Sequence, residues 1–201
     1  MRVLLRLAVV AIASVPAIAA VAQEAYFPKA TLSDNPRSDQ FSVDWYSREL
    51  KLLEEPSLFK QDNNPSSESY RFLWLRTFHH PIAIRLDLRP DGSSVLTTKV
   101  ADGEAGFLRS IKHLLENTSR PLPREQAKAF LAQIKRVSFW SITSPVNENG
   151  CDGAEWIIEG VQHGEYHVVH QWSPEEGPIR ELGLLFVFGL AQMNIPKDQI
   201  Y

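Results

Sequence analysis

The sequence predicts an α+β fold: one antiparallel sheet of five or six strands, with about three helices packed mainly on one face. Apolar and aromatic runs of strand length follow one another with short turns between them, and short connections favour antiparallel pairing. Two segments have the three-and-four spacing of amphipathic helices, and a third is an uncharged apolar run near the end of the chain. The strand–helix–strand alternation typical of a parallel sheet does not occur in the sequence.

The first 22 residues have the pattern of a cleavable signal peptide. Arg2 and Arg6 form a short basic segment, and an apolar run with small residues at its end leads to Ala22. We expect cleavage after Ala22, with Ala19 as the alternative position, and therefore a periplasmic or secreted protein. The competing interpretation is an uncleaved anchor, because the apolar run approaches the length of a membrane-spanning helix.

The charge and the cysteine content limit the partners that the exported chain could have. The formal net charge is −3, and removal of Arg2 and Arg6 would make it more acidic. The rest of the chain has no basic cluster, which argues against nucleic acid and, after cleavage, against a membrane as partner. Cys151 is the only cysteine, so an intrachain disulfide is impossible. We expect the partner to be a protein or a small molecule.

The region after the signal peptide divides into an arm and one domain. Residues 23–40 contain scattered charges and prolines without a period, which favours an extended or poorly ordered arm. Residues 41–201 form the single α+β domain. It begins with an amphipathic helix over residues 41–53, in which Val43, Tyr46 and Leu50 share a face. A polar loop over residues 60–69 follows.

Three strands and an ambiguous segment follow the polar loop. Residues 70–77, 82–88 and 94–100 read as strands, and the turn between the last two contains Pro90-Asp91-Gly92. Residues 107–116 fit a strand or a helix. We interpret the four segments as a meander of neighbouring strands.

The C-terminal half adds a helix, a hairpin and a last helix. Residues 123–136 predict a helix with proline in its first turn. Residues 154–172 predict a β-hairpin with a two-residue turn at His163-Gly164, and we expect both strands inside the sheet, with aromatic side chains against the closing helix. Residues 178–193 predict that helix, buried in the core; a partner-binding helix is the alternative.

The hairpin carries the weak catalytic candidates of the chain. A two-residue turn places Glu159 diagonal to His170 on one face, near enough for a charged hydrogen bond. Such a pair could act as a general acid and base, or it could be a cross-strand ion pair with a structural role. The sequence shows no nucleophile motif beside it, so we assign no catalytic residue.

Metal and cofactor chemistry is not favoured by the spacing of the candidate ligands. His167 and His170 are three residues apart, so on a strand they point to opposite faces. Cys151 has no basic neighbour to lower the pKa of its thiol, and no glycine-rich phosphate loop occurs. We expect no metal and no cofactor. A ligand surface is a further hypothesis, because arginine beside aromatic side chains can bind acidic or planar groups; its candidates are Arg71, Trp74, His79, His80 and Trp172.

The chain resembles a family of uncharacterised bacterial exported proteins. The resemblance lies in residues 70–86, in Phe139-Trp140, and in the signature DGAEWIIEG…YHVVHQWSPE…RELGL over residues 152–184. It implies one exported domain and no known activity. We therefore expect a periplasmic, non-catalytic binding or accessory module. The alternatives are a hydrolase or transferase that uses Glu159 and His170, and an inhibitor or structural partner of another exported protein.

Overall fold

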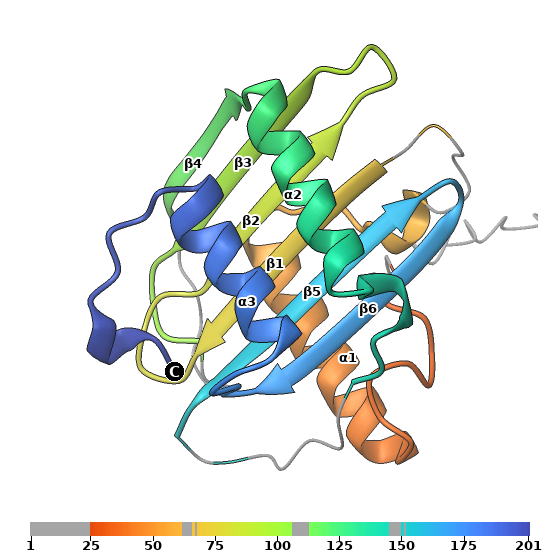
Figure 1. Cartoon of the computed structure of the whole chain (residues 1–201). Coiled ribbons are helices and arrows are strands. Elements are labelled where there is room, and N and C mark those ends of the chain that lie inside the picture. Colours follow the sequence, from red (N-terminus) through yellow and green to blue (C-terminus); the bar gives the residue numbers. More distant parts are fainter. Residues whose placement is uncertain (1–24, 62–65, 67, 106–112, 145–149, 151) are drawn as a thin grey trace, which may run out of the picture.

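A computed structural model describes residues 25–61, 66, 68–105, 113–144, 150 and 152–201. The predicted signal peptide over residues 1–22 and the cysteine Cys151 lie outside the described residues. The centre of the molecule is one six-stranded antiparallel sheet in the order β4-β3-β2-β1-β5-β6 (Figure 1). Its strands are β1 Glu68–Arg76, β2 Ile82–Leu88, β3 Ser94–Ala101, β4 Leu114–Pro121, β5 Ala154–Gln162 and β6 Glu165–Trp172.

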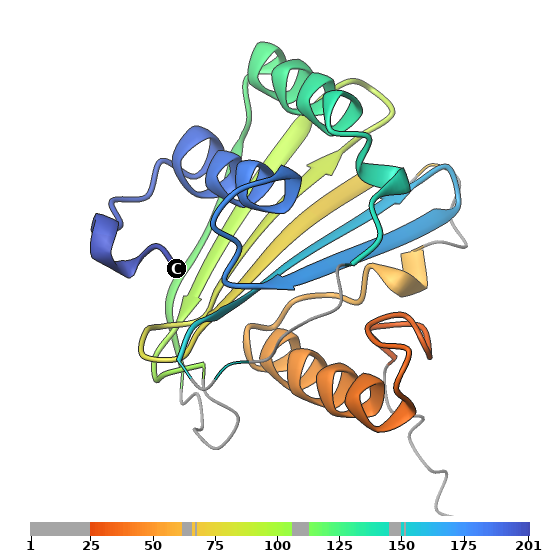
Figure 2. The same cartoon turned by 60° about the horizontal axis from the view of Figure 1, so that its bottom comes forward.

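Three helices cover the sheet, which confirms the α+β prediction. The helices α2 (Arg124–Arg136) and α3 (Pro178–Leu184) lie on one face, and α1 (Pro36–Leu52) lies on the other (Figure 2). α3 continues directly as a π-helix, η3 (Leu185–Leu190). Short 3-10 helices occur at η1 (Phe59–Gln61), η2 (Phe139–Ser141) and η4 (Lys197–Gln199). Both faces of the sheet are therefore covered. This explains why β1 has apolar residues on both of its faces and does not alternate between apolar and polar residues.

The predicted hairpin is confirmed in its turn and register, but not in its place in the sheet. Gln162 pairs with Glu165, and His163 and Gly164 have φ values of 54° and 84°, as a type I′ turn requires. β5 pairs with β1 on its other side and is an inner strand. β6 is an edge strand, so the expectation of two inner strands is wrong for β6.

Two element boundaries differ from the sequence-based prediction. α1 begins at Pro36 rather than at residue 41, because the Asn35 side chain caps the backbone N–H groups of Arg37 and Ser38 and proline is favoured at the first helical position. The fourth strand is Leu114–Pro121 rather than 107–116. Residues 107–112 of that prediction lie outside the described part of the chain.

The arm also differs from its prediction, because its described part packs against the domain. Tyr26, Phe27 and Leu32 are buried with residues of α1. The Asp39 carboxylate holds the arm: it accepts hydrogen bonds at 2.9–3.3 Å from four successive backbone N–H groups, those of residues 30–33. A carboxylate bound in this way is strongly stabilised, which explains why Asp39 is buried.

The face covered by α2 and α3 contains an aromatic core. Its strand residues Phe72, Trp74 and Trp156 are fully buried and contact one another. α3 approaches the sheet closely at Gly183, where an added Cβ would lie 2.4 Å from the Trp156 ring. Glycine at this position therefore sets the distance between the helix and β5. None of the described helices is long and apolar enough to cross a membrane.

Candidate functional site

The α1 face of the sheet contains a buried group of charged side chains, which we call the ion network. Its members come from four neighbouring strands and from the turn after α1. The three cations and three carboxylates are Arg71, Arg85, Lys99, Glu55, Asp87 and Glu159. Such a group is stable in a protein interior only when the charges satisfy one another.

Arg71 and Glu159 form the centre of the ion network. The side chains of both residues are fully buried. Arg71 donates to one oxygen of Glu159 from Nε at 2.8 Å and from Nη2 at 2.5 Å. Arg71 Nη1 also donates to the Pro56 carbonyl at 2.6 Å, and Tyr166 donates to the other oxygen of Glu159 at 2.9 Å. The guanidinium and the carboxylate are thus both enclosed by protein groups.

Burial and the neighbouring charges together set the pKa values at this centre. Burial raises the pKa of Glu159, and the neighbouring Arg71 and the Tyr166 hydroxyl only partly oppose this. Burial and the Glu159 charge raise the pKa of Tyr166 well above its ordinary value. Burial would lower the pKa of Arg71, but Glu159 and Glu55 more than offset it. Arg71 is therefore charged and Tyr166 neutral at physiological pH.

Glu55 joins three cations to the turn that follows α1. Arg85 Nε donates to Glu55 Oε2 at 2.9 Å, and Arg71 lies 3.4 Å from the same oxygen. Lys99 Nζ lies 3.2 Å from Glu55 Oε1 as an ion pair and donates to the Glu54 carbonyl at 2.7 Å. The cations of the ion network are thus bound by the chain itself, so they are not available to an anionic ligand.

The second polar region is a cleft between the arm, the start of α1 and the edge strand β6, which we call the arm cleft. Its volume is about 680 Å³, within the range of small-molecule sites. The lining is rich in groups that form hydrogen bonds. The polar residues of the lining are Thr31, Ser33, Asp34, Asn35, Ser38, Ser42, Thr143, Ser144, His167 and His170.

His170 joins the arm cleft to the interior. Its Nε2 lies 2.6 Å from the Leu32 carbonyl, and because a carbonyl only accepts, Nε2 carries the hydrogen. Its Nδ1 lies 3.3 Å from the Tyr46 hydroxyl and 3.5 Å from Glu155. Burial and the Glu155 charge raise the pKa of Tyr46. Both ring nitrogens of His170 therefore contact protein groups, and the ring fixes the arm to β6.

The two residues of the predicted pair lie in different regions: Glu159 belongs to the ion network, and His170 lines the arm cleft. The two side chains share a face of the hairpin, and the pairing places Glu159 opposite Val168 and His170 opposite Ile157. Glu159 contacts Arg71 and Tyr166, whereas His170 contacts Leu32, Tyr46 and Glu155. The structure thus gives the two catalytic candidates different partners.

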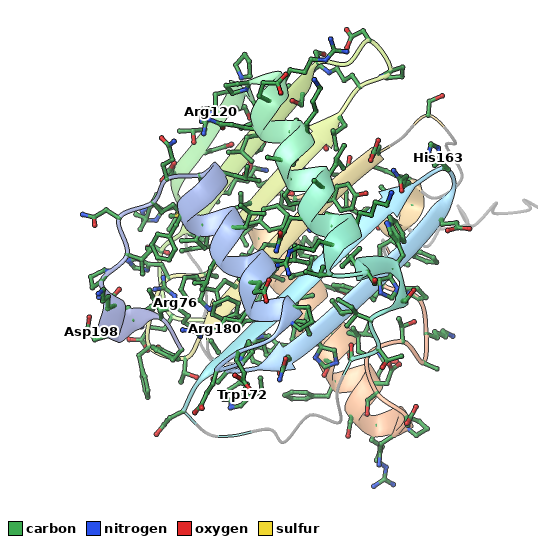
Figure 3. All side chains as sticks on the ribbon, viewed as in Figure 1. Arg76, Arg120, His163, Trp172, Arg180 and Asp198 are labelled. Atoms are coloured by element: carbon green, nitrogen blue, oxygen red, sulfur yellow. The ribbon has the colours of Figure 1, made fainter. Side chains whose placement is uncertain are left out.

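The predicted ligand residues lie in different parts of the molecule. Arg71 is in the ion network, and Trp74 is buried on the opposite face. His79 and His80 are in the loop after β1, where their Nδ1 atoms lie 2.7 Å from the Tyr201 hydroxyl and 2.7 Å from the Gly103 carbonyl. Trp172 is at the end of β6 away from the hairpin tip, where His163 lies (Figure 3). These residues do not gather on one surface.

A second, apolar groove lies between α2 and η3 and has a volume of about 540 Å³. Phe130, Leu185 and the exposed Phe188 contribute to its lining. Among the described residues, no three His, Cys, Asp or Glu side chains come together in a group that could hold a metal. The arm cleft is thus the better candidate for a polar ligand.

The sequence does not indicate several polar contacts of the site, although it places Tyr46 on the apolar face of its helix. Glu55, Tyr46 and Glu155 have no local motif, because their partners come from distant segments. The start of α1 did have a signal: Asn35-Pro36 is a helix cap followed by a favoured first residue. Comparison of the chain with models of protein families and with curated proteins gives no match.

Proposed function

We propose that the protein is exported to the periplasm and there binds, without catalysis, a small uncharged polar molecule in the arm cleft. The observation that carries the proposal is the lining of the cleft, where hydroxyl, amide and imidazole groups surround a volume of about 680 Å³. Sites of this size with a few converging polar groups are typical of small ligands.

The charges of the arm cleft favour an uncharged ligand. The described lining contains the Asp34 carboxylate and no lysine or arginine. An anion would therefore meet no compensating cation there, and the cations of the ion network are already bound to Glu55 and Glu159. Hydroxyl-rich linings can donate to and accept from a neutral ligand equally well.

The arrangement of His170 favours binding over catalysis. A general base needs a nitrogen within reach of the substrate proton, but Nε2 of His170 already donates to the Leu32 carbonyl at 2.6 Å. The alternative of a hydrolase or transferase also needs Glu159, whose oxygens contact Arg71 and Tyr166. His170 would thus stabilise the wall of the cleft and would not exchange a proton with a ligand bound there.

The test is a titration of the purified protein with monosaccharides, sugar alcohols, amino acids and short neutral peptides. A ligand that binds the native state raises its melting temperature. We expect at least one neutral compound to do so, and the variant Ser38→Trp to abolish the effect, because Ser38 is an exposed residue of the lining. Gln40→Trp is the matched control, since Gln40 is exposed on the same helix outside the lining.

Two outcomes would contradict this proposal. Binding that survives Ser38→Trp unchanged would place the ligand elsewhere, and chemical conversion of the bound compound would make the protein an enzyme. The export part is checked separately by cell fractionation and by sequencing the N-terminus of the purified chain. We expect the chain to begin at Gln23; retention of Met1 in a membrane fraction would indicate an anchor.

A further inference from the structure

The two edges of the sheet differ in how they are covered. At β6, the backbone N–H of His170 donates to the Ser144 hydroxyl at 3.0 Å, and the middle of the strand is buried. At β4, the residues from Asn117 to Pro121 are all exposed. Within the described part of the chain, β3 is the one strand that pairs with β4. Figure 3 places Arg120 at this edge.

The pairing with β3 determines which backbone groups of β4 point outward. The N–H of Leu122 donates to the Ser94 carbonyl at 3.0 Å, and the register continues without interruption from Val95–Pro121 to Val100–Glu116. In an antiparallel ladder the direction of the backbone groups alternates from residue to residue. The N–H and C=O groups of Asn117 and Ser119 therefore point away from β3, toward solvent.

The charges of β4 are symmetric about Thr118. Glu116 and Arg120 lie two residues before and two residues after it. If a second β4 pairs antiparallel with Thr118 opposite Thr118, each Glu116 lies opposite the Arg120 of the other copy. The same register places the outward groups of Asn117 opposite those of Ser119, so they can form four backbone hydrogen bonds. Opposite charges directly across a strand pair are stabilising.

We infer that β4 is a self-association surface, through which two copies of the protein join their sheets in an antiparallel β4–β4 pair centred on Thr118. The partner is a second copy because the strand is complementary to itself in both charge and hydrogen bonding, as a two-fold interface requires. Exposed edge strands readily accept another strand. A single strand pair is a small interface, so the dimer forms and dissociates with protein concentration.

The register is tested by cysteine cross-linking in a chain whose Cys151 is replaced by serine. The two Thr118 residues form a non-hydrogen-bonded pair, for which a Cα–Cα distance of about 4.5 Å is usual, so Thr118→Cys can form a disulfide between copies. Asn117→Cys is the matched control: its two copies would be offset by two residues, beyond the reach of a disulfide of about 7 Å. We expect Thr118→Cys to cross-link at least about tenfold faster.

The charge complementarity is tested by sedimentation of the purified protein from about 1 μM to about 1 mM. Glu116→Arg and Arg120→Glu each place like charges across the interface, and we expect each to weaken the dimer about tenfold or more. A mixture of the two variants restores both opposite-charge pairs and should form a heterodimer. Glu125→Arg, at an exposed residue of α2, should leave association unchanged.

Folding of each variant is checked by circular dichroism, because Arg120 also donates to the Leu190 carbonyl. Ser119→Pro gives an independent test, since it removes an outward N–H without changing a charge; it should weaken the dimer as well. The inference is overturned if Thr118→Cys cross-links no faster than Asn117→Cys. It is equally overturned if the wild type stays monomeric throughout the concentration range, or if the mixed variants do not associate.

Discussion

On β1, Phe72 and Trp74 point toward α2 and α3, while Arg71, next to Phe72, points toward the α1 side, and all three are fully buried. The first face excludes water by contact between aromatic rings. The second face encloses charges that satisfy one another. Overpacking an apolar core costs about 1–3 kcal/mol, whereas removal of one partner from a buried charge pair costs about 3–5 kcal/mol. The two faces should therefore respond differently to substitution.

The largest effect is expected at the centre of the ion network. Arg71→Ala leaves Glu159 buried with the Tyr166 hydroxyl as its remaining partner, and removal of one member of a buried pair costs about 3–5 kcal/mol. Urea unfolding of the purified variant measures the loss. Arg136→Ala is the matched control, because Arg136 pairs with Glu181 at the surface and an exposed pair contributes about 1 kcal/mol or less. Equal losses in both variants would refute a special role for the ion network.

A smaller loss is expected on the aromatic face, at Gly183. The added Cβ of Gly183→Ala would lie 2.4 Å from the Trp156 ring, and overpacking of a core costs about 1–3 kcal/mol. Gly189→Ala is the control, since its added Cβ meets the end of the flexible Leu185 side chain at 2.6 Å. Chemical denaturation of both variants should show a loss for the first only. A Gly183→Ala protein as stable as the wild type would show that α3 can move away from β5.

The next prediction concerns pH and the α1 face. Burial raises the pKa of Glu49 above its ordinary value of 4.5, against the effect of Arg48. At a pH between the pKa of Glu49 in the unfolded chain and its higher pKa in the native state, the native state binds more protons than the unfolded chain. The contribution of Glu49 to stability therefore falls as pH rises through the native pKa. We expect Glu49→Gln to gain stability relative to the wild type on going from pH 4 to pH 7.5.

Stability of the Glu49 variant is measured by thermal unfolding across that range. Glu125→Gln, at an exposed carboxylate, is the comparison and should follow the wild-type profile. If the difference between Glu49→Gln and the wild type grows toward low pH instead, the assigned direction of the pKa shift is wrong.

The smallest effect is expected at the end of α1. Glu54 has a φ of 54°, a conformation that glycine adopts without strain. Its backbone carbonyl, which binds Lys99, is unaffected by the substitution. We expect Glu54→Gly to raise stability by about 0.5–1 kcal/mol. Lys51→Gly, three residues earlier in the last turn of the helix, should lower stability by about 1 kcal/mol. In thermal denaturation, the first variant should therefore unfold at a higher temperature than the wild type and the second at a lower one.

The fold could largely be predicted from local patterns. The period of α2, the turn at His163-Gly164 and the meander of the first strands depend on residues close in sequence, and all three are found. The arm was mispredicted because its order depends on Asp39, whose side chain binds residues 30–33. The spacing of apolar residues along the sequence gives no information about such a contact.

The candidate site could be predicted only in part. The hairpin register placed Glu159 and His170 on one face correctly. Their partners were not predictable, because Arg71 is 88 residues from Glu159 and Tyr46 is 124 residues from His170. A charged residue in a strand usually indicates a solvated face, so the sequence gives no sign that Arg71 is buried.

The place of β5 between β1 and β6 has a consequence for the order of folding. The first four strands can pair as soon as they are available, but Arg71 then lacks Glu159, which arrives with the last quarter of the chain. A partly synthesised chain would have to keep this arginine hydrated, and the α1 face would stay open. Contacts of such long range slow folding. The chain should therefore complete its sheet and close the α1 face late, when β5 has paired with β1.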